Sequence, residues 1–171
     1  PDTDPQGEAP QALETITVTA RRIDEQLQKV PLPITAITAD VIEDKGFVDI
    51  RDIAAFTPSF SFRSGFGRDG DRPVIRGMSN IQGEPNASFF IDGVYVSGDI
   101  SGYGLENLER VEVIRGPQSA AFGRRTFSGA VNFITRRPGN EPTGKFTLGG
   151  GSYGQRKLTG FYAGPIVEDL L

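Results

Sequence analysis

Four short runs of β-branched and aromatic residues between positions 74 and 137 constrain the fold of this chain most. They read VIRG (74–77), SFFIDGVYV (88–96), RVEVIRG (110–116) and AVNFITRR (in the region 129–137). Turn-forming residues separate these runs, which is the pattern of β-strands joined by turns and loops. A fifth run, ITAIT (34–38), predicts one more short strand ahead of them.

Short helices are predicted between these strands. Segment 39–46 offers Asp40 as an N-cap, and segment 49–58 begins with Asp49 as a cap. Segment 117–123, PQSAAFG, suits a single helical turn. Strands interspersed with short helices in this way predict an α+β fold with a small mixed sheet.

The texture of the sequence changes after Pro138. Residues 139–171 open with a linker, GNEPTG, and continue with two alternating segments around a Gly-Ser-Tyr-Gly turn. Strands of about 9–11 residues separated by turn residues are typical of transmembrane β-barrels. Two strands cannot close a barrel. We therefore expect residues 139–171 to be the linker and first strands of a barrel that is truncated here.

The N-terminal region combines a strand signal with a segment that lacks a core. Segment 14–20, ETITVTA, alternates Thr with Ile, Val and Ala, as a strand does. Residues 1–13 are acidic, rich in Pro and nearly free of large apolar side chains. Such a segment buries too little surface to offset the entropy of ordering it. Residues 1–13 are therefore predicted to be a flexible tail that ends in a strand.

Composition excludes several classes of function. The net charge is −4, and the four acids among residues 1–20 account for it, leaving 18 acids and 18 bases in the remainder. An acidic chain without a basic stripe argues against nucleic-acid binding. The absence of Cys and His removes thiolate metal ligands, the commonest general base and the usual transition-metal ligand. We expect no enzyme activity, no cofactor and no metal site in this chain.

Two loop motifs suggest ligands but fit poorly. Gly65 to Gly70 matches the dinucleotide pattern G-x-G-x-x-G, yet Pro73 then leads a strand where the motif needs a helix. Asp69 and Asp71 suggest calcium, but the spacing and closing Glu of an EF-hand are missing. A loop of permissive glycines is the simpler interpretation.

Residues 105–138, LENLERVEVIRGPQSAAFGRRTFSGAVNFITRRP, strongly resemble the plug domain of TonB-dependent outer-membrane receptors. The resemblance extends to PVIRG, FFIDGVYV and the N-terminal ETITVTA, and it runs from about residue 14 to the end in the family's order. Several motifs at suitable spacing are more specific than any single motif. The departures, at Phe122, Ser128 and Phe133, concern packing.

The resemblance implies an architecture and a protein partner. Residues 21–138 would form a plug inside the chain's own barrel of about 22 strands. The barrel would lie in the bacterial outer membrane, with the N-terminus in the periplasm. Segment 14–20 would be the TonB box, which the C-terminal domain of TonB takes by strand addition. The box residues are Glu14, Thr15, Ile16, Thr17, Val18, Thr19 and Ala20. An ordinary edge strand of the plug is the alternative for this segment.

Two arginines occupy matching positions in the repeated sequence IRG. Arg76 and Arg115 each follow a predicted strand and precede Gly. A guanidinium pairs bidentately with a carboxylate. The resemblance implies that these two arginines form a latch, contacting carboxylates on the barrel wall. Solvated strand ends are the alternative.

The resemblance also implies transport. Such a plug would block the barrel lumen, help to bind a small-molecule substrate and pass the pulling force of TonB to open a path. Family members import ferric siderophores, with oligosaccharides, haem and cobalamin as other substrates, and an iron chelate is the first expectation here. A soluble periplasmic binding module is the alternative outside the family. The candidate contacts come from three loops, where solvated tips are the simpler alternative, and are Arg68, Asp69, Gln82, Asn86, Asp99 and Tyr103.

Overall fold

The computed structural model describes residues 16–19, 25–26, 32–63, 72–79, 85–98, 100, 102–123, 126–154 and 156–164. The predictions for the tail 1–13 lie outside these residues. So do those for three residues of the proposed box and four of the candidate substrate contacts, namely Glu14, Thr15, Ala20, Arg68, Asp69, Gln82 and Asp99.

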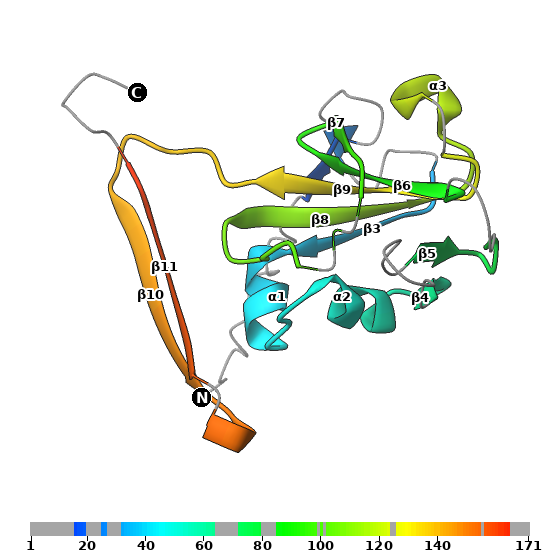
Figure 1. Ribbon diagram of the computed structural model, residues 1–171. Coiled ribbons are helices and arrows are strands. Elements are labelled where there is room, and N and C mark those ends of the chain that lie inside the picture. Colours follow the sequence, from blue (N-terminus) through cyan, green and yellow to red (C-terminus); the bar gives the residue numbers. More distant parts are fainter. Residues whose placement is uncertain are drawn as a thin grey trace, which may run out of the picture.

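A five-stranded sheet is the centre of the fold, in the order β3-β8-β9-β6-β7 (Figure 1). Its strands are β3 (Ile34–Thr38), β6 (Ala87–Ile91), β7 (Val94–Val96), β8 (Leu108–Arg115) and β9 (Gly129–Thr135). The β6–β9 pair is parallel and the other three pairs are antiparallel. The predicted mixed sheet and α+β class are confirmed.

The sheet buries a different cluster on each face, because successive side chains of a strand point to opposite sides. Val111 and Val113 of β8 belong to the larger cluster, together with residues of two helices. Ile114 belongs to the smaller cluster on the other face. The helices of the larger cluster are α1 (Ala39–Asp44) and α2 (Ile50–Phe56), which lie along one face of the sheet (Figure 1).

The helix starts test the capping predictions. α2 is capped by Asp49, and Asp52 completes a capping box by accepting from the Asp49 N–H. The prediction for α1 is wrong: its N-cap is Thr38, whose hydroxyl accepts from Val41 N at 3.5 Å. β3 runs directly into α1, so the last strand residue is the extended one that capping requires, and Asp40 falls inside the first turn. The predicted turn at 117–123 is confirmed as α3 (Ser119–Phe122).

The run 88–96 forms two strands, whereas one strand was predicted. Asp92 and Gly93 turn the chain between β6 and β7 with φ angles of 48° and 78°. The Asp92 carboxylate accepts from the Thr135 N–H at 2.9 Å and from the Thr135 hydroxyl at 2.6 Å. Contacts with the end of β9 thus hold a backbone conformation that is uncommon for a residue other than Gly.

Two short strand pairs flank the central sheet. β4 (Phe60–Arg63) pairs with β5 (Arg72–Ile75). At the N-terminus, β1 (Thr17–Val18) pairs antiparallel with β2 (Glu25–Gln26). The strand predicted over 14–20 therefore appears as a two-residue strand, and its partner lies in a segment that showed no strand signal.

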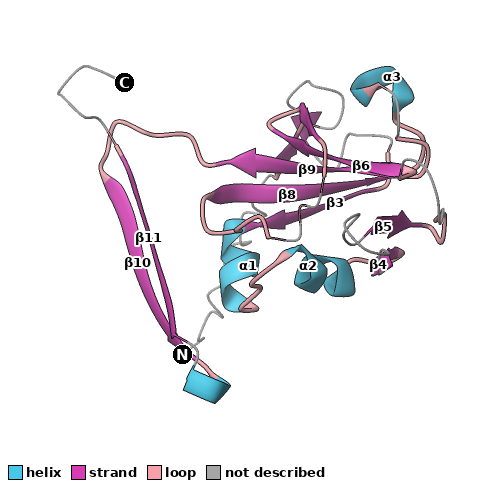
Figure 2. Ribbon diagram, in the orientation of Figure 1, coloured by secondary structure: helices cyan, strands magenta, loops and turns pink. Residues whose placement is uncertain are grey.

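The C-terminal segments form a long hairpin of β10 (Thr143–Gly150) and β11 (Arg156–Ala163) around the turn η3 (Ser152–Gly154). Figure 2 shows it standing to one side of the central sheet. One face carries large apolar side chains that are between 63% and 76% exposed, namely Phe146, Leu148, Leu158 and Tyr162. Among the described residues, no helix has the length and apolar character needed to cross a membrane.

Candidate functional site

The short strand β1 is docked on the smaller apolar cluster. Val18 has no exposed surface and packs with Phe90, Ile114, Phe122 and Ala130. Ile16 is partly buried against the same cluster, whereas Thr17 is exposed. The alternation of Ile, Thr and Val that predicted a strand thus points Val18 into the protein core.

Thr19 continues this docking through polar contacts. Its main-chain N–H donates to Glu112 Oε1 at 2.8 Å, and its hydroxyl lies 3.4 Å from the same oxygen. Arg110 Nη2 donates to the Thr19 hydroxyl at 2.9 Å. Glu112 of β8 therefore contacts both the main chain and the side chain of Thr19, and Arg110 of the same strand contacts its side chain.

Arg110 and Glu112 form an ion pair beneath this segment. They lie two residues apart on one strand and so share a face, with Arg110 Nε 2.8 Å from Glu112 Oε1. Glu112 is fully buried, and its Oε2 has no hydrogen-bond partner among the described residues. Arg110 also contacts Glu109, whose side chain is half exposed. Since burying a carboxylate is costly unless it is paired, Glu112 depends on Arg110 and Thr19.

Sequence reasoning did not find Arg110 and Glu112. The available signal was the alternation Arg-Val-Glu-Val within a strand whose other residues are apolar. Charged residues at alternate positions usually mark a solvated face. Here that face is covered by segment 16–19. Thr19, which contacts Glu112, precedes it by 93 residues in the sequence.

Arg76 lies at a strained turn after β5. Its φ is 56°, the following Gly77 has φ 73°, and its N–H donates to Ser59 O at 2.8 Å. A Cβ atom added at Gly116 would lie 3.3 Å from Arg76 Nη1. The guanidinium of Arg76 therefore lies against the residue that follows Arg115, which brings the two IRG units together.

Arg115 is held by main-chain oxygens at the end of β8. Its Nε lies 3.4 Å from Pro33 O, and its Nη1 lies 3.5 Å from Pro58 O. Within the described ranges, neither Arg76 nor Arg115 forms an ion pair. Among the described residues, both guanidinium groups therefore have N–H donors without an anionic partner.

Of the candidate substrate contacts, the structure describes Asn86 and Tyr103. The Asn86 carbonyl accepts from Ser128 N at 3.0 Å, which ties this loop end to the start of β9. The ring of Tyr103 packs edge-on against Phe133 with centroids 5.3 Å apart. Tyr103 is partly buried on the larger cluster, so much of its side chain serves packing.

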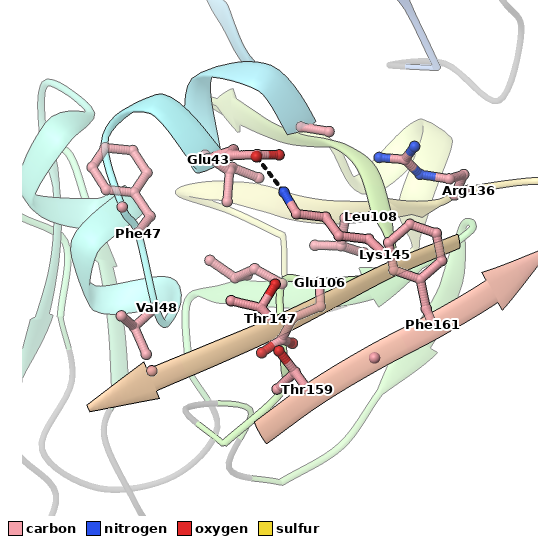
Figure 3. A pocket seen from close by; sticks show the side chains of 16 residues that line it. Glu43, Phe47, Val48, Glu106, Leu108, Arg136, Lys145, Thr147, Thr159 and Phe161 are labelled. Atoms are coloured by element: carbon pink, nitrogen blue, oxygen red, sulfur yellow. Dashed lines mark ion pairs between the residues drawn. The ribbon is translucent and has the colours of Figure 1, made fainter. Parts of the chain in front are cut away.

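A cavity of about 300 Å³ separates the hairpin from α1 and was not foreseen from the sequence (Figure 3). Lys145 of β10 forms an ion pair with Glu43 of α1 beside it. The guanidinium of Arg136 lies 5.2 Å from the ring centroid of Phe161. The apolar lining of the cavity includes Ile42, Phe47, Leu105, Leu108 and Phe161.

Clusters of acidic side chains would be the candidate metal ligands in the part of the chain that the structure describes. There, no group of three or more His, Cys, Asp or Glu residues lies close enough to hold a metal ion. The polar groups at the centre of the site are Arg110, Glu112 and Thr19, which are joined by hydrogen bonds that leave Glu112 Oε2 without a partner among the described residues.

Comparison with known families identifies the fold. A family model described as the TonB-dependent receptor plug domain matches residues 26–130, which include four strands of the central sheet and the first two residues of β9. The chain belongs to the TonB-dependent receptor plug domain family. The charged pair of β8 and the sheet that it belongs to are therefore parts of a plug domain.

Similar proteins carry this plug domain within much longer chains. A vitamin B12 transporter of Photobacterium profundum is 29% identical over 161 residues, 91% of this chain and 26% of that protein. A ferrioxamine B receptor of Salmonella typhimurium is 28% identical over 147 residues, 82% of this chain and 20% of that protein. The chain spans about a quarter or less of these relatives.

Solved structures agree with the assignment of the plug fold. The alcaligin outer-membrane receptor of Bordetella pertussis gives a TM-score of 0.73 at 25% identity and covers 90% of this chain and 27% of that receptor. A complex of FpvAI with pyocin S2 gives a TM-score of 0.74 at 24% identity, over 89% of this chain and 20% of that chain. The likeness to the complex concerns the fold alone.

Proposed function

We propose that this chain is the plug of an outer-membrane transporter. It blocks the lumen of a barrel, helps to bind a small-molecule substrate and passes the pulling force of TonB to open a transport path. The observation that carries this proposal is the direct contact of segment 16–19 with β8 through Val18 and Thr19. A pull on the N-terminal segment would therefore act on the central sheet.

Segment 14–20 is proposed as the TonB box. A strand that pairs through its main chain can be taken over by the exposed sheet edge of a partner. β1 has strand conformation, and among the described residues its pairing with β2 involves two of its residues, so little of that main-chain pairing must be lost first. TonB is a periplasmic protein, which would place the N-terminus in the periplasm and the plug within the outer membrane.

The hairpin β10–β11 is proposed to begin the barrel wall. Its exposed apolar face, with Leu148 opposite Leu158, suits contact with lipid. The other face carries Lys145, Thr147 and Phe161 toward the plug (Figure 3). An apolar outer face and a mixed inner face are what a barrel strand around a polar plug requires.

The latch role of Arg76 and Arg115 follows from the same architecture. The Arg76 guanidinium lies against Gly116, the residue after Arg115, and neither arginine forms an ion pair among the described residues. Carboxylates on the barrel wall would complete them through bidentate pairs. Polar contacts of this kind let a plug seal the lumen and still move, because water can replace them.

A ferric siderophore is the first candidate substrate and cobalamin the second. The ferrioxamine B receptor and the alcaligin receptor support the first, and the vitamin B12 transporter supports the second. Arg68, Asp69, Gln82, Asn86, Asp99 and Tyr103 remain proposed contacts on the substrate side.

Uptake by the full-length receptor tests the proposal. Cells that express it should accumulate one labelled ligand from a panel of ferric siderophores, haem, cobalamin and oligosaccharides, and accumulation should stop when TonB is deleted. Surface binding of that ligand should persist without TonB. Accumulation that continues at the same rate without TonB would contradict the proposed mechanism. A receptor recovered from the periplasm without detergent would favour the soluble binding module.

A further inference from the structure

The plug contains a polar site that is shaped around one residue of its own N-terminal segment. Thr19 offers a main-chain N–H and a hydroxyl, and both are contacted by the ion pair of Arg110 and Glu112. We infer that Arg110 and Glu112 form an internal docking site for segment 16–19 that selects Thr at position 19. The link to TonB in this inference rests on the proposed function.

The selection of Thr follows from how the contacts divide. Glu112 Oε1 takes the main-chain N–H at 2.8 Å, a contact that any residue except Pro could make. Arg110 Nη2 needs an acceptor, and the Thr19 hydroxyl provides it at 2.9 Å. Valine at this position has the same shape but no acceptor. It would leave a nearly buried guanidinium with one donor unpaired, which costs far more than the loss of a solvated bond.

Reversibility follows from the burial of Glu112. In the docked state its carboxylate is fully buried, and Oε2 lacks a partner among the described residues. When segment 16–19 leaves, water can reach this carboxylate and recover its hydration. The free energy gained by hydrating the carboxylate therefore offsets much of the free energy lost with the Thr19 contact, as is typical of buried ion pairs. The site can hold the segment without trapping it.

Val18 adds apolar contact to this polar site. Its side chain fills a place among Phe90, Ile114, Phe122 and Ala130, next to the Thr19 contact. An external strand-binding partner needs the main chain of the same segment. The internal site therefore competes with that partner, and the docked fraction lowers the partner's apparent affinity.

Accessibility of residue 18 in the full-length receptor tests the inference. The 171 residues contain no Cys, so Val18→Cys gives a single thiol here once any cysteines elsewhere in the receptor are replaced. Thr19→Val and Glu112→Gln should each raise the rate of thiol labelling at position 18 by about tenfold or more. Thr17→Val removes the same hydroxyl from an exposed position of the same segment and should leave the rate unchanged.

A second thiol separates undocking from loosening of the whole plug. Val113 lies on the other face of β8 and is also fully buried, so Val113→Cys places the second thiol there. Its labelling should not change in Thr19→Val or Glu112→Gln. An unchanged rate at position 18 would overturn the docking site, and so would equal increases at positions 18 and 113.

Binding of the isolated C-terminal domain of TonB distinguishes this inference from the proposed function. If the segment is the TonB box, Thr19→Val and Glu112→Gln should increase binding to receptors in membranes, by up to the increase in labelling. Faster labelling at position 18 with no TonB binding to any variant would reject the TonB box and keep the docking site.

Discussion

At the scale of single residues, close approach of strands fixes the identity of one glycine. Gly129 begins β9 and lies against β8, where a Cβ atom would come within 2.3 Å of Ile114 O and 2.8 Å of Ile75 Cδ1. Gly46 ends the α1 turn with φ 67°, but a Cβ atom there would meet nothing within 4 Å. Both positions have a positive φ, 67° at Gly46 and 156° at Gly129, but Gly129 alone of the two also meets this close approach.

The pair gives a matched prediction for stability. Gly46→Ala should lower the free energy of unfolding of the plug by about 1 kcal/mol, the usual cost of a side chain in the left-handed region. Gly129→Ala should cost roughly 3 kcal/mol or more, because the backbone of β8 must shift. Urea unfolding followed by thiol exposure at position 113 would measure both changes. Equal costs would show that β9 can relax away from β8.

At the scale of elements, proline substitutions in the N-terminal strand should separate substrate uptake from substrate binding. Proline lacks the N–H that strand pairing needs and distorts an extended segment. Ile16→Pro or Val18→Pro should therefore abolish substrate uptake by the full-length receptor, while substrate binding at the cell surface stays within about twofold. Ala12→Pro, in the tail ahead of the segment, is the control and should transport normally. Wild-type uptake by both strand variants would exclude the TonB box.

Element prediction succeeded where a local pattern decides the outcome. β3 has the predicted bounds, 34–38, since the run of β-branched residues in ITAIT is a local signal. It failed where distant contacts decide. The turn at Asp92, with its positive φ, is held by contacts with β9, among them the two hydrogen bonds from Thr135, 43 residues away. The buried state of Glu112 likewise depends on Thr19, so no local pattern could reveal it.

At the scale of the whole molecule, the two IRG arginines bear on how a plug stays in its barrel. Removing one partner of a deeply buried ion pair typically costs about 3–5 kcal/mol, and a wet surface pair contributes only ~0–1 kcal/mol. A plug–barrel interface lies between these limits. Arg76→Ala or Arg115→Ala in the full-length receptor should therefore loosen the plug without unfolding it.

Conductance across planar bilayers measures this loosening. Both alanine variants should raise the leak of small ions, and Arg→Lys at the same positions should restore only part of the seal, because Lys cannot form the bidentate pair. Arg63→Ala removes an exposed arginine of β4 that donates to Ser79 Oγ at 3.3 Å, and it should not leak. If neither Arg76→Ala nor Arg115→Ala leaks, the two residues are ordinary strand ends.

The order of strands in the central sheet also has a mechanical consequence. β3 is an edge strand, and its first pair joins Ile34 to Ile114, beside Arg115. If a pull enters at Ile34 while Arg115 anchors the plug, both forces act at the same end of the β3–β8 pair. The hydrogen bonds of that pair would then open one after another, as in a zipper, and would not share the load as in shear. A modest tension could therefore peel β3 away and leave β8, β9, β6 and β7 joined.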